Sequence, residues 1–345
     1  ASLSSSARIH LMNSLAKLAE RDPWFRVGHW DASVTGLGQK DLVPQFRDIL
    51  LDKKNSNSLR SIVLDAIYAG RLAEEMLETL LKLAQDDLLV VIERKDAINA
   101  ILQLGELGNK AVLNIFANLS RSKNDFQVRT HVIRSMYGKG IGPESLAELL
   151  EDALNIDIEL PFGVLWALDK VVPDDDIISI LECFNPPNDS SVTSSDYENN
   201  SDVLQVIDEL ISRAIVFDPV PSPELILDWL DKRKHVGHNY HRQGKNCLQI
   251  ALKENKSLLA EVTKYYFANS ESACEYSHAL YEFEKLMVEA VDWSIVLESA
   301  CSVLFSTDSV NRAFYLEIAF ISAFKVGFSA LAEFNLLLAL RDEPD

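Results

Sequence analysis

A sequence pattern of about 34 residues is repeated four times between residues 59 and 184. Each copy opens with an apolar segment of helical period, and the four opening segments occupy residues 59–70, 94–105, 128–138 and 161–171. The ends of successive segments lie 35, 33 and 33 residues apart, at Gly70, Gly105, Gly138 and Val171. A period this steady predicts helical hairpins that stack on one another, because one hairpin of this length cannot bury its own apolar face.

Each copy is predicted to form two helices joined by a turn. In the first helix, apolar side chains such as Ile62, Ala66 and Ile67 form a stripe on one face. The glycine that follows permits the left-handed backbone that closes a helix. Second apolar runs then occupy residues 73–81, 111–116, 145–150 and 176–181. The sequence therefore predicts an all-α fold, an α-solenoid or α-α superhelix of stacked helical hairpins.

Charged residues recur at the same place in the pattern. Arg60, Arg94 and Arg129 lie near the starts of three first helices, and Asp125 lies four residues before Arg129. This arrangement resembles the Asp/Arg ladder of HEAT-type repeats. The resemblance implies a HEAT-like solenoid in which ion pairs link neighbouring hairpins.

The chain divides into four predicted parts: N-terminal helices with an aromatic capping loop (1–58), four HEAT-like hairpins (59–184), a polar loop or linker (185–202) and C-terminal helical repeats (203–345). The loop is predicted because this Ser/Asn-rich segment has almost nothing apolar to bury. In the C-terminal part, Ser222 followed by Pro223 marks a helix start, since serine caps helices and proline is tolerated at the first helical position.

Composition limits the function classes. The formal net charge is -19, from 52 acidic and 33 basic side chains in 345 residues. Such a surface repels a phosphate backbone or an anionic membrane and disfavours general affinity for nucleic acid. The most apolar tract, residues 313–340, is interrupted by Glu317, Lys325 and Glu333, so no membrane span and no membrane partner are predicted.

Cysteine usage and the chain start indicate a compartment. The cysteines are far apart and show no CxxC spacing, and they are Cys183, Cys247, Cys274 and Cys301. We expect four thiols in a reducing, cytoplasmic environment. The sequence begins without Met and without a signal peptide, so we expect either a piece of something longer or a processed chain.

One basic segment, residues 232–245, stands out in this acidic chain. Its candidates for binding a partner or an anion are Lys232, Arg233, Lys234, His235, His238, Tyr240, His241, Arg242 and Lys245. They could hold a phosphate, a nucleic-acid strand or an acidic protein surface, with Tyr240 available for stacking. In the alternative interpretation, the three cations at 232–234 complement a helix C-terminus and the rest is a solvated loop.

No catalytic constellation and no cofactor site are predicted. The three histidines of the basic segment could ligate zinc together with Cys247 or a nearby carboxylate, but Gly237 and Asn239 weaken the helix needed to align them. The glycine-rich segment 138–144 lacks the Lys-Ser/Thr ending of a phosphate loop and follows a helix rather than a strand. We therefore predict a non-enzymatic protein, with a helical hydrolase or transferase of unrecognised motif as the enzymatic alternative.

Further segments carry a family resemblance, and they are residues 46–51, 63–70 and 163–168, with Asp228-Trp229-Leu230 followed by His241-Arg242. Over residues 41–245, the chain resembles the HEAT-like helical region of large bacterial NACHT/STAND-type NTPase signalling proteins. The resemblance implies a sensor or scaffold segment of a cytoplasmic signalling ATPase of the kind used in defence against phage. The ATP-binding motifs of such a protein would lie outside this chain.

The predicted function is that of a scaffold or sensor that binds a macromolecular partner. Repeat stacks generally bind on their concave face, so a protein on that face is the first expectation. Other domains of the same longer chain are further candidate partners. The alternative is a helical module that binds nucleic acid or phosphate through residues 232–245.

Overall fold

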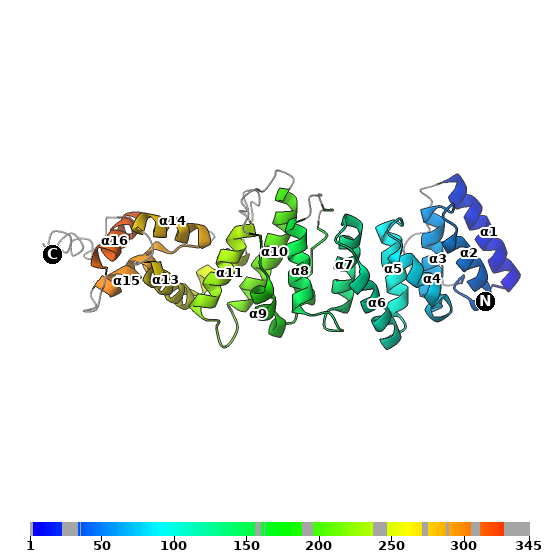
Figure 1. Ribbon diagram of the computed structural model, residues 1–345, viewed down its shortest axis with the longest axis horizontal. Helices are drawn as coiled ribbons and strands as arrows, with labels where there is room; N and C mark the ends of the chain where they lie inside the picture. The colour runs from blue at the N-terminus through cyan, green and yellow to red at the C-terminus, as the bar shows by residue number, and fades with distance from the viewer. Residues whose placement is uncertain are drawn as a thin grey trace. The chain divides into compact units, whose positions relative to one another are not determined.

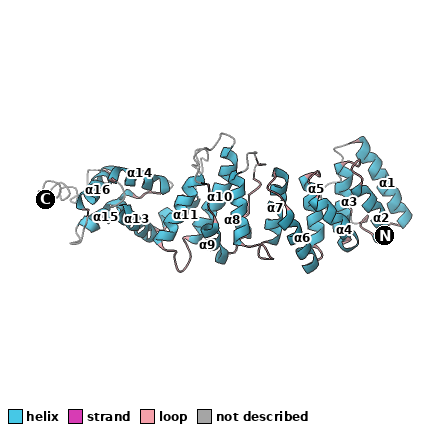
Figure 2. Cartoon of the chain, viewed as in Figure 1, coloured by secondary structure: helices cyan, strands magenta, loops and turns pink. Residues whose placement is uncertain are grey.

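A computed structural model describes residues 3–22, 34, 36–155, 160–161, 163–187, 196–236, 247–270, 275–287, 290–304 and 311–327. Within these residues every secondary-structure element is a helix, and there are sixteen α-helices and two short 3-10 helices. Figure 2 shows these helices joined by loops. The all-α fold predicted from the sequence is confirmed. The chain divides into two compact units, residues 1–149 (unit 1) and residues 150–345 (unit 2).

Unit 1 holds the first helices of the chain, labelled in Figure 1, and the unit boundary falls within α8. The elements are α1 Ser5–Arg21, η1 Lys40–Leu42, α2 Val43–Leu51, α3 Asn57–Gly70, α4 Ala73–Gln85, α5 Val91–Leu102, α6 Glu106–Asn118, α7 Lys123–Met136 and α8 Pro143–Asn155. Helices α3, α5 and α7 match the first helices predicted for repeats one to three, and α4, α6 and α8 match the second helices.

Alternate helices of unit 1 pack on one another in two rows. Helix α3 contacts both α1 and α5, and α5 contacts α7, while α4 contacts both α2 and α6. The apolar stripe predicted for the first helices lies in this core, where Ile62, Ile67, Ile98 and Ile133 are fully or almost fully buried. Full burial of one such side chain stabilises the fold by about 1.5–3 kcal/mol. The repeat spacing thus places the same stripe at each helix contact.

The closing glycines act differently from one another. Gly105 and Gly138 have φ values of +62° and +74°, the left-handed region predicted for them. Gly70 is still helical, and Arg71 adopts the left-handed conformation in its place. Gly70 is required for close packing instead, since a Cβ atom there would lie 2.3 Å from the carbonyl oxygen of Gly38. The prediction was therefore wrong about the role of Gly70.

Unit 2 contains the remaining helices (Figure 1). The elements are η2 Asp169–Val171, α9 Asp174–Cys183, α10 Asp196–Ala214, α11 Pro223–Val236, α12 Cys247–Glu254, α13 Lys256–Ser270, α14 Tyr276–Leu286, α15 Trp293–Leu304 and α16 Arg312–Val326. Contacts between alternate helices recur here, from α11 to α13 to α15, from α10 to α12 and from α14 to α16. Ser222 caps α11 as predicted, because its Oγ accepts a hydrogen bond from the Leu225 amide at 3.3 Å.

The first helix predicted for the fourth hairpin is absent. In place of an α-helix over residues 161–171, the described residues form successive turns and the short helix η2. Gly163 and Ala167 have φ values of +73° and +62°, which interrupt a helical hydrogen-bond ladder. The buried carboxylate of Asp202 accepts a hydrogen bond from the Gly163 amide at 3.0 Å and holds the turn. Apolar periodicity alone therefore misassigned this segment.

Two other expectations differ from or fall outside the described structure. Helix α10 begins at Asp196, so the segment expected to be loop through residue 202 becomes helical earlier. The aromatic capping loop around Trp24 and Trp30 lies outside the described residues. None of the described helices has both the length and the apolar character that crossing a membrane requires.

We predict that Gly70→Ala destabilises unit 1 by about 1–3 kcal/mol, because the added methyl group overpacks the contact with Gly38. The higher helix propensity of alanine acts in the opposite direction by up to about 1 kcal/mol. Gly142→Ala is the matched control, since its Cβ would meet only the Glu144 side chain, at 3.4 Å. Urea unfolding followed by circular dichroism measures both variants. A stabilised Gly70→Ala protein would contradict the packing role.

Candidate functional site

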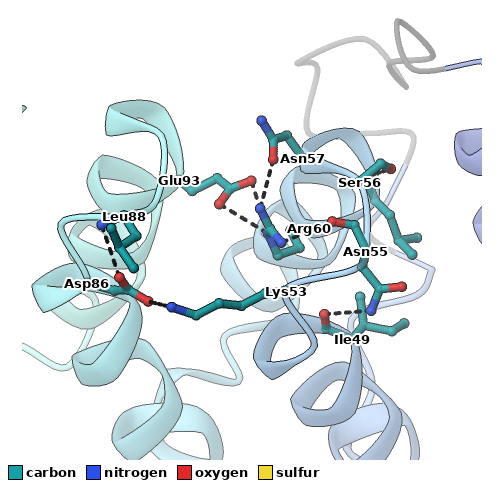
Figure 3. A network of polar contacts seen from close by, with 10 residues as sticks. Ile49, Lys53, Asn55, Ser56, Asn57, Arg60, Asp86, Leu88 and Glu93 are labelled. Carbon is teal, nitrogen blue, oxygen red and sulfur yellow. Dashed lines mark hydrogen bonds and ion pairs between the residues drawn. The ribbon is translucent and has the colours of Figure 1, made fainter.

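A buried ion pair joins the first two repeat hairpins. Arg60 on α3 directs its Nε to the carboxylate of Glu93 on α5, at 3.2 and 3.1 Å from the two oxygens. Its remaining nitrogens donate to the Asn55 carbonyl at 3.0 Å and the Asn57 side-chain oxygen at 2.7 Å. Figure 3 shows the Arg60 guanidinium enclosed by these three residues. The pair is satisfied on the guanidinium side, as a buried charge must be.

A second buried pair joins the next two first helices. Arg94 on α5 donates to Asp125 on α7 at 2.7 Å, and its Nε donates to the Ala84 carbonyl at 3.0 Å. Asp125 also accepts hydrogen bonds from the amide of Ser120 at 2.8 Å and from the Ser120 hydroxyl at 2.5 Å. Arg60 and Arg94 thus occupy equivalent places in successive repeats and make equivalent links.

The third link lies within one hairpin, between its first and second helices. Arg129 on α7 is buried, and its Nη2 lies 3.9 Å from Glu148 on α8. The Glu148 side chain is 51% exposed and also pairs with Arg121 at 3.0 Å. The Arg129 guanidinium carbon lies 6.0 Å from the centre of the Phe116 ring, which adds a cation–π contact. We call the three links made by Arg60, Arg94 and Arg129 the arginine ladder.

The pKa values of the two buried carboxylates of the ladder, Glu93 and Asp125, are shifted in opposite directions. Burial alone would raise the pKa of Asp125, but hydrogen bonds from Ser120 and Arg94 together hold it below its usual value. The contribution of Asp125 to the free energy of unfolding is therefore complete above its unfolded pKa, about 3.9. It is lost as the pH falls through the folded pKa. Burial raises the pKa of Glu93, and the opposing field of Arg60 does not cancel that effect. The contribution of this pKa shift of Glu93 to the free energy of unfolding is therefore complete below its unfolded pKa, about 4.3. It is lost as the pH rises through the folded pKa.

In unit 2 an arginine of the predicted basic segment makes a similar buried pair. Arg233 on α11 donates to Asp208 on α10 from Nε at 2.6 Å and from Nη2 at 3.2 Å. Only about 3% of the arginine is exposed to solvent. Its position in the core leaves no guanidinium surface for a ligand, and its contact with Asp208 links two helices of the unit.

The other three described residues of the basic segment also have internal contacts. Lys232 donates to the carbonyl oxygens of Leu181 and Glu182, at 3.1 and 2.9 Å, at the C-terminus of α9. Lys234 pairs with Glu282 on α14 at 2.7 Å. His235 lies 3.5 Å from Asp231, one turn earlier on the same helix. Lys232 therefore complements a helix C-terminus, but that of α9 and not that of its own helix.

His238, Tyr240, His241, Arg242 and Lys245 lie outside the described residues. Among the residues that the structure does describe, no three His, Cys, Asp or Glu side chains gather as metal ligands would.

Cysteine placement bears on the predicted thiols and on the zinc hypothesis. Cys183, Cys247 and Cys301 are thiols and not part of a disulfide, and Cys274 is outside the described residues. Burial raises the pKa of Cys247 to about 11, which disfavours the thiolate that a zinc site requires.

The net negative charge of the chain comes from unit 2. Residues 1–149 contain 19 Lys and Arg against 18 Asp and Glu, whereas residues 150–345 contain 14 against 34. Unit 1 is therefore close to neutral at +1, and unit 2 carries a formal charge of -20. The basic segment lies in the strongly acidic unit, and the repulsion of anions inferred from the whole sequence applies to that unit alone.

The sequence indicated the basic side of the ladder better than its acidic side. The recurrence of Arg60, Arg94 and Arg129 was visible, and so was Asp125. Glu93 was missed, although it lies 33 residues after Arg60, just as Asp125 lies 31 residues after Arg94. A search for carboxylates about one repeat after each arginine would have found it.

We predict that Arg94→Met lowers the free energy of unfolding by about 3–5 kcal/mol, because it leaves the buried Asp125 without its cation. Lys82→Met is the control, since it removes an exposed pair with Glu78 of comparable length, 2.8 Å. We expect no measurable change from it. Urea unfolding of both variants decides the question, and equal losses would argue against a stabilising ladder.

For unit 2 we predict that Arg233→Met destabilises the protein by about 3–5 kcal/mol and that adding Asp208→Leu recovers much of the loss. The reason is that the double variant buries no unpaired charge. Lys234→Met removes a partly exposed pair and should have the smaller effect. Thermal unfolding of the wild type, Arg233→Met, Asp208→Leu and the double variant measures the coupling of the pair, and Lys234→Met is measured beside them. Full stability of Arg233→Met would contradict a structural role.

Comparisons of this chain with protein-family models, with curated proteins and with solved structures gave no significant match.

Proposed function

We propose that this chain is a non-enzymatic α-solenoid scaffold that binds a protein partner along the concave face of its stacked hairpins. The observation that carries the proposal is the arginine ladder of unit 1. Its first two links recur at about one-repeat spacing, so the first helices of three successive hairpins are joined by buried arginine–carboxylate pairs. Proteins built in this way present an extended surface of recurring helix faces, which suits a macromolecule better than a small substrate.

Exposed apolar side chains favour protein as the partner. The connection between α4 and α5 carries Leu88 and Val90, of which 79% and 40% are exposed, and Ile92 in the first turn of α5 is 41% exposed. Large exposed apolar side chains close together in the sequence are a feature that protein-binding surfaces share. The loop after α2 lies against this connection, because Lys53 pairs with Asp86 at 2.8 Å, as Figure 3 shows.

Charge distribution supports protein over nucleic acid as the partner of unit 2. The described half of the basic segment is engaged with Asp208, Glu282, Asp231 and the end of α9. The surrounding unit carries a formal charge of -20, which repels a phosphate backbone. A nucleic-acid-binding module would need a basic surface that dominates its surroundings.

The proposal includes a place in a larger protein. The sequence resemblance over residues 41–245 supports a role as the helical sensor or scaffold region of a NACHT/STAND-type signalling NTPase. This part of the proposal rests on the resemblance alone. Reading the gene for a strand, phosphate loop and helix upstream of these residues tests it.

The test of partner class uses the full chain as bait in extract from its source cells, with and without nuclease. We expect a protein that remains bound after nuclease treatment and cross-links to unit 1. Leu88→Ser combined with Ile92→Ser should weaken its capture at least tenfold. Val216→Ser is the control, since Val216 is 68% exposed but lies in unit 2. Recovery of nucleic acid alone, or capture that nuclease abolishes, would refute the proposal.

A further inference from the structure

Residues 163–172 of unit 2 have the apolar spacing of a helix but the backbone of successive turns. Leu165, Leu168 and Val172 are buried, and their spacing places such side chains on one face of an α-helix. The described backbone hydrogen bonds of the segment join an amide to the carbonyl three residues earlier, as from Leu168 to Leu165 at 3.2 Å. An α-helix requires bonds that reach four residues back.

Two backbone conformations keep this segment from being a helix. Gly163 and Ala167 have φ values of +73° and +62°. Glycine adopts this left-handed region at little cost, but in alanine the Cβ atom comes too close to the following carbonyl oxygen. The Ala167 side chain is exposed, so packing of its methyl group offsets little of that cost. Alanine also has the highest helix propensity of all residues, so Ala167 itself favours the helical backbone.

Helix α10 already binds the groups that a helix over this segment would leave without partners. The first amides and the last carbonyls of any α-helix have no partner within the helix. At the beginning of the segment, the Gly163 amide donates to the buried Asp202 carboxylate at 3.0 Å. At its end, Arg213 donates to the carbonyls of Asp169 and Val172, at 2.7 and 2.8 Å. The charges also fit, because a carboxylate stabilises a helix N-terminus and a guanidinium stabilises a C-terminus.

We propose that residues 163–172 are a two-state element that converts between the turns of the described structure and a single α-helix. Both forms bury the same apolar side chains and keep the same contacts with α10. Pro173 ends the helix, since proline cannot continue one. The main difference between the forms is the φ value of Gly163 and Ala167. Conversion completes the first helix predicted for the fourth hairpin, so the segment can act as a conformational switch.

Trp166 gives a partner access to this switch. Its side chain is 45% exposed, and it lies between the two left-handed residues in the sequence. In the turn form its ring lies against Gly163, where a Cβ atom would come within 2.8 Å of the ring. A ligand that binds one form more tightly shifts the populations of the two forms, and one that binds both equally does not. The switch does not rest on the proposed scaffold function.

The test is Gly163→Ala in the full chain, followed by amide hydrogen exchange resolved to single residues. Alanine disfavours the left-handed backbone and meets the Trp166 ring, so the helical form should dominate. We expect the Ala167 amide to exchange more slowly by roughly tenfold or more, because it gains the Gly163 carbonyl, which accepts from the Trp166 amide in the turn form. Gly105→Ala is the matched control, since Gly105 also has a positive φ but lies between two complete helices. It should lower stability without slowing any exchange.

Ala167→Gly is the opposite variant, and it keeps the proposal testable if Gly163→Ala does not fold. It removes the cost of left-handed alanine and weakens a helix, so it should stabilise the turn form. Urea unfolding followed by circular dichroism measures the stability of each variant. Unchanged or faster exchange throughout residues 163–172 in folded Gly163→Ala would overturn the proposal, because the glycine would then only permit a turn. A loss of stability in Ala167→Gly would also overturn it.

Discussion

A guanidinium cannot lie in an apolar interior unless carboxylates or carbonyls surround it, and this constraint organises unit 1. Arg60 and Arg94 are almost fully buried, and each reaches a carboxylate supplied by the following repeat. Apolar contacts between helices tolerate sliding, because one methyl group can replace another. A buried ion pair does not, since a shift of one residue would leave both charges unpaired. The ladder therefore fixes the register in which the apolar stripes meet.

The same solution appears in unit 2 with a different sequence context. Arg233 and Asp208, which are 25 residues apart, link α11 to α10, whereas the two fully buried links of unit 1 span 31 and 33 residues. Lys232 and Lys234 extend the link to α9 and α14. Residues that look like a binding surface in the sequence thus join four helices of the unit. Clustered positive charge in an acidic chain can reflect internal pairing as readily as a ligand.

Sequence reasoning was most successful where one period controls the structure. Helices α3 to α8 were recognised because the apolar stripe and its repeat distance agree. It failed at residues 161–171, where apolar spacing persists but the backbone of Gly163 and Ala167 leaves the helical region. It also missed the reason for Gly70, since the contact with Gly38 joins segments that no local pattern relates.

Helix α5 carries both halves of the ladder in two adjacent residues. Glu93 receives the arginine of the hairpin before it, and Arg94 reaches the aspartate of the hairpin after it. Copying or deleting one whole hairpin would therefore leave each arginine facing an acid. A recombination event that cut the gene between Glu93 and Arg94, or that shifted one of them by a residue, would leave buried charges without partners in both neighbouring hairpins. Growth of this array by gene duplication is thus confined to cuts in the connecting loops.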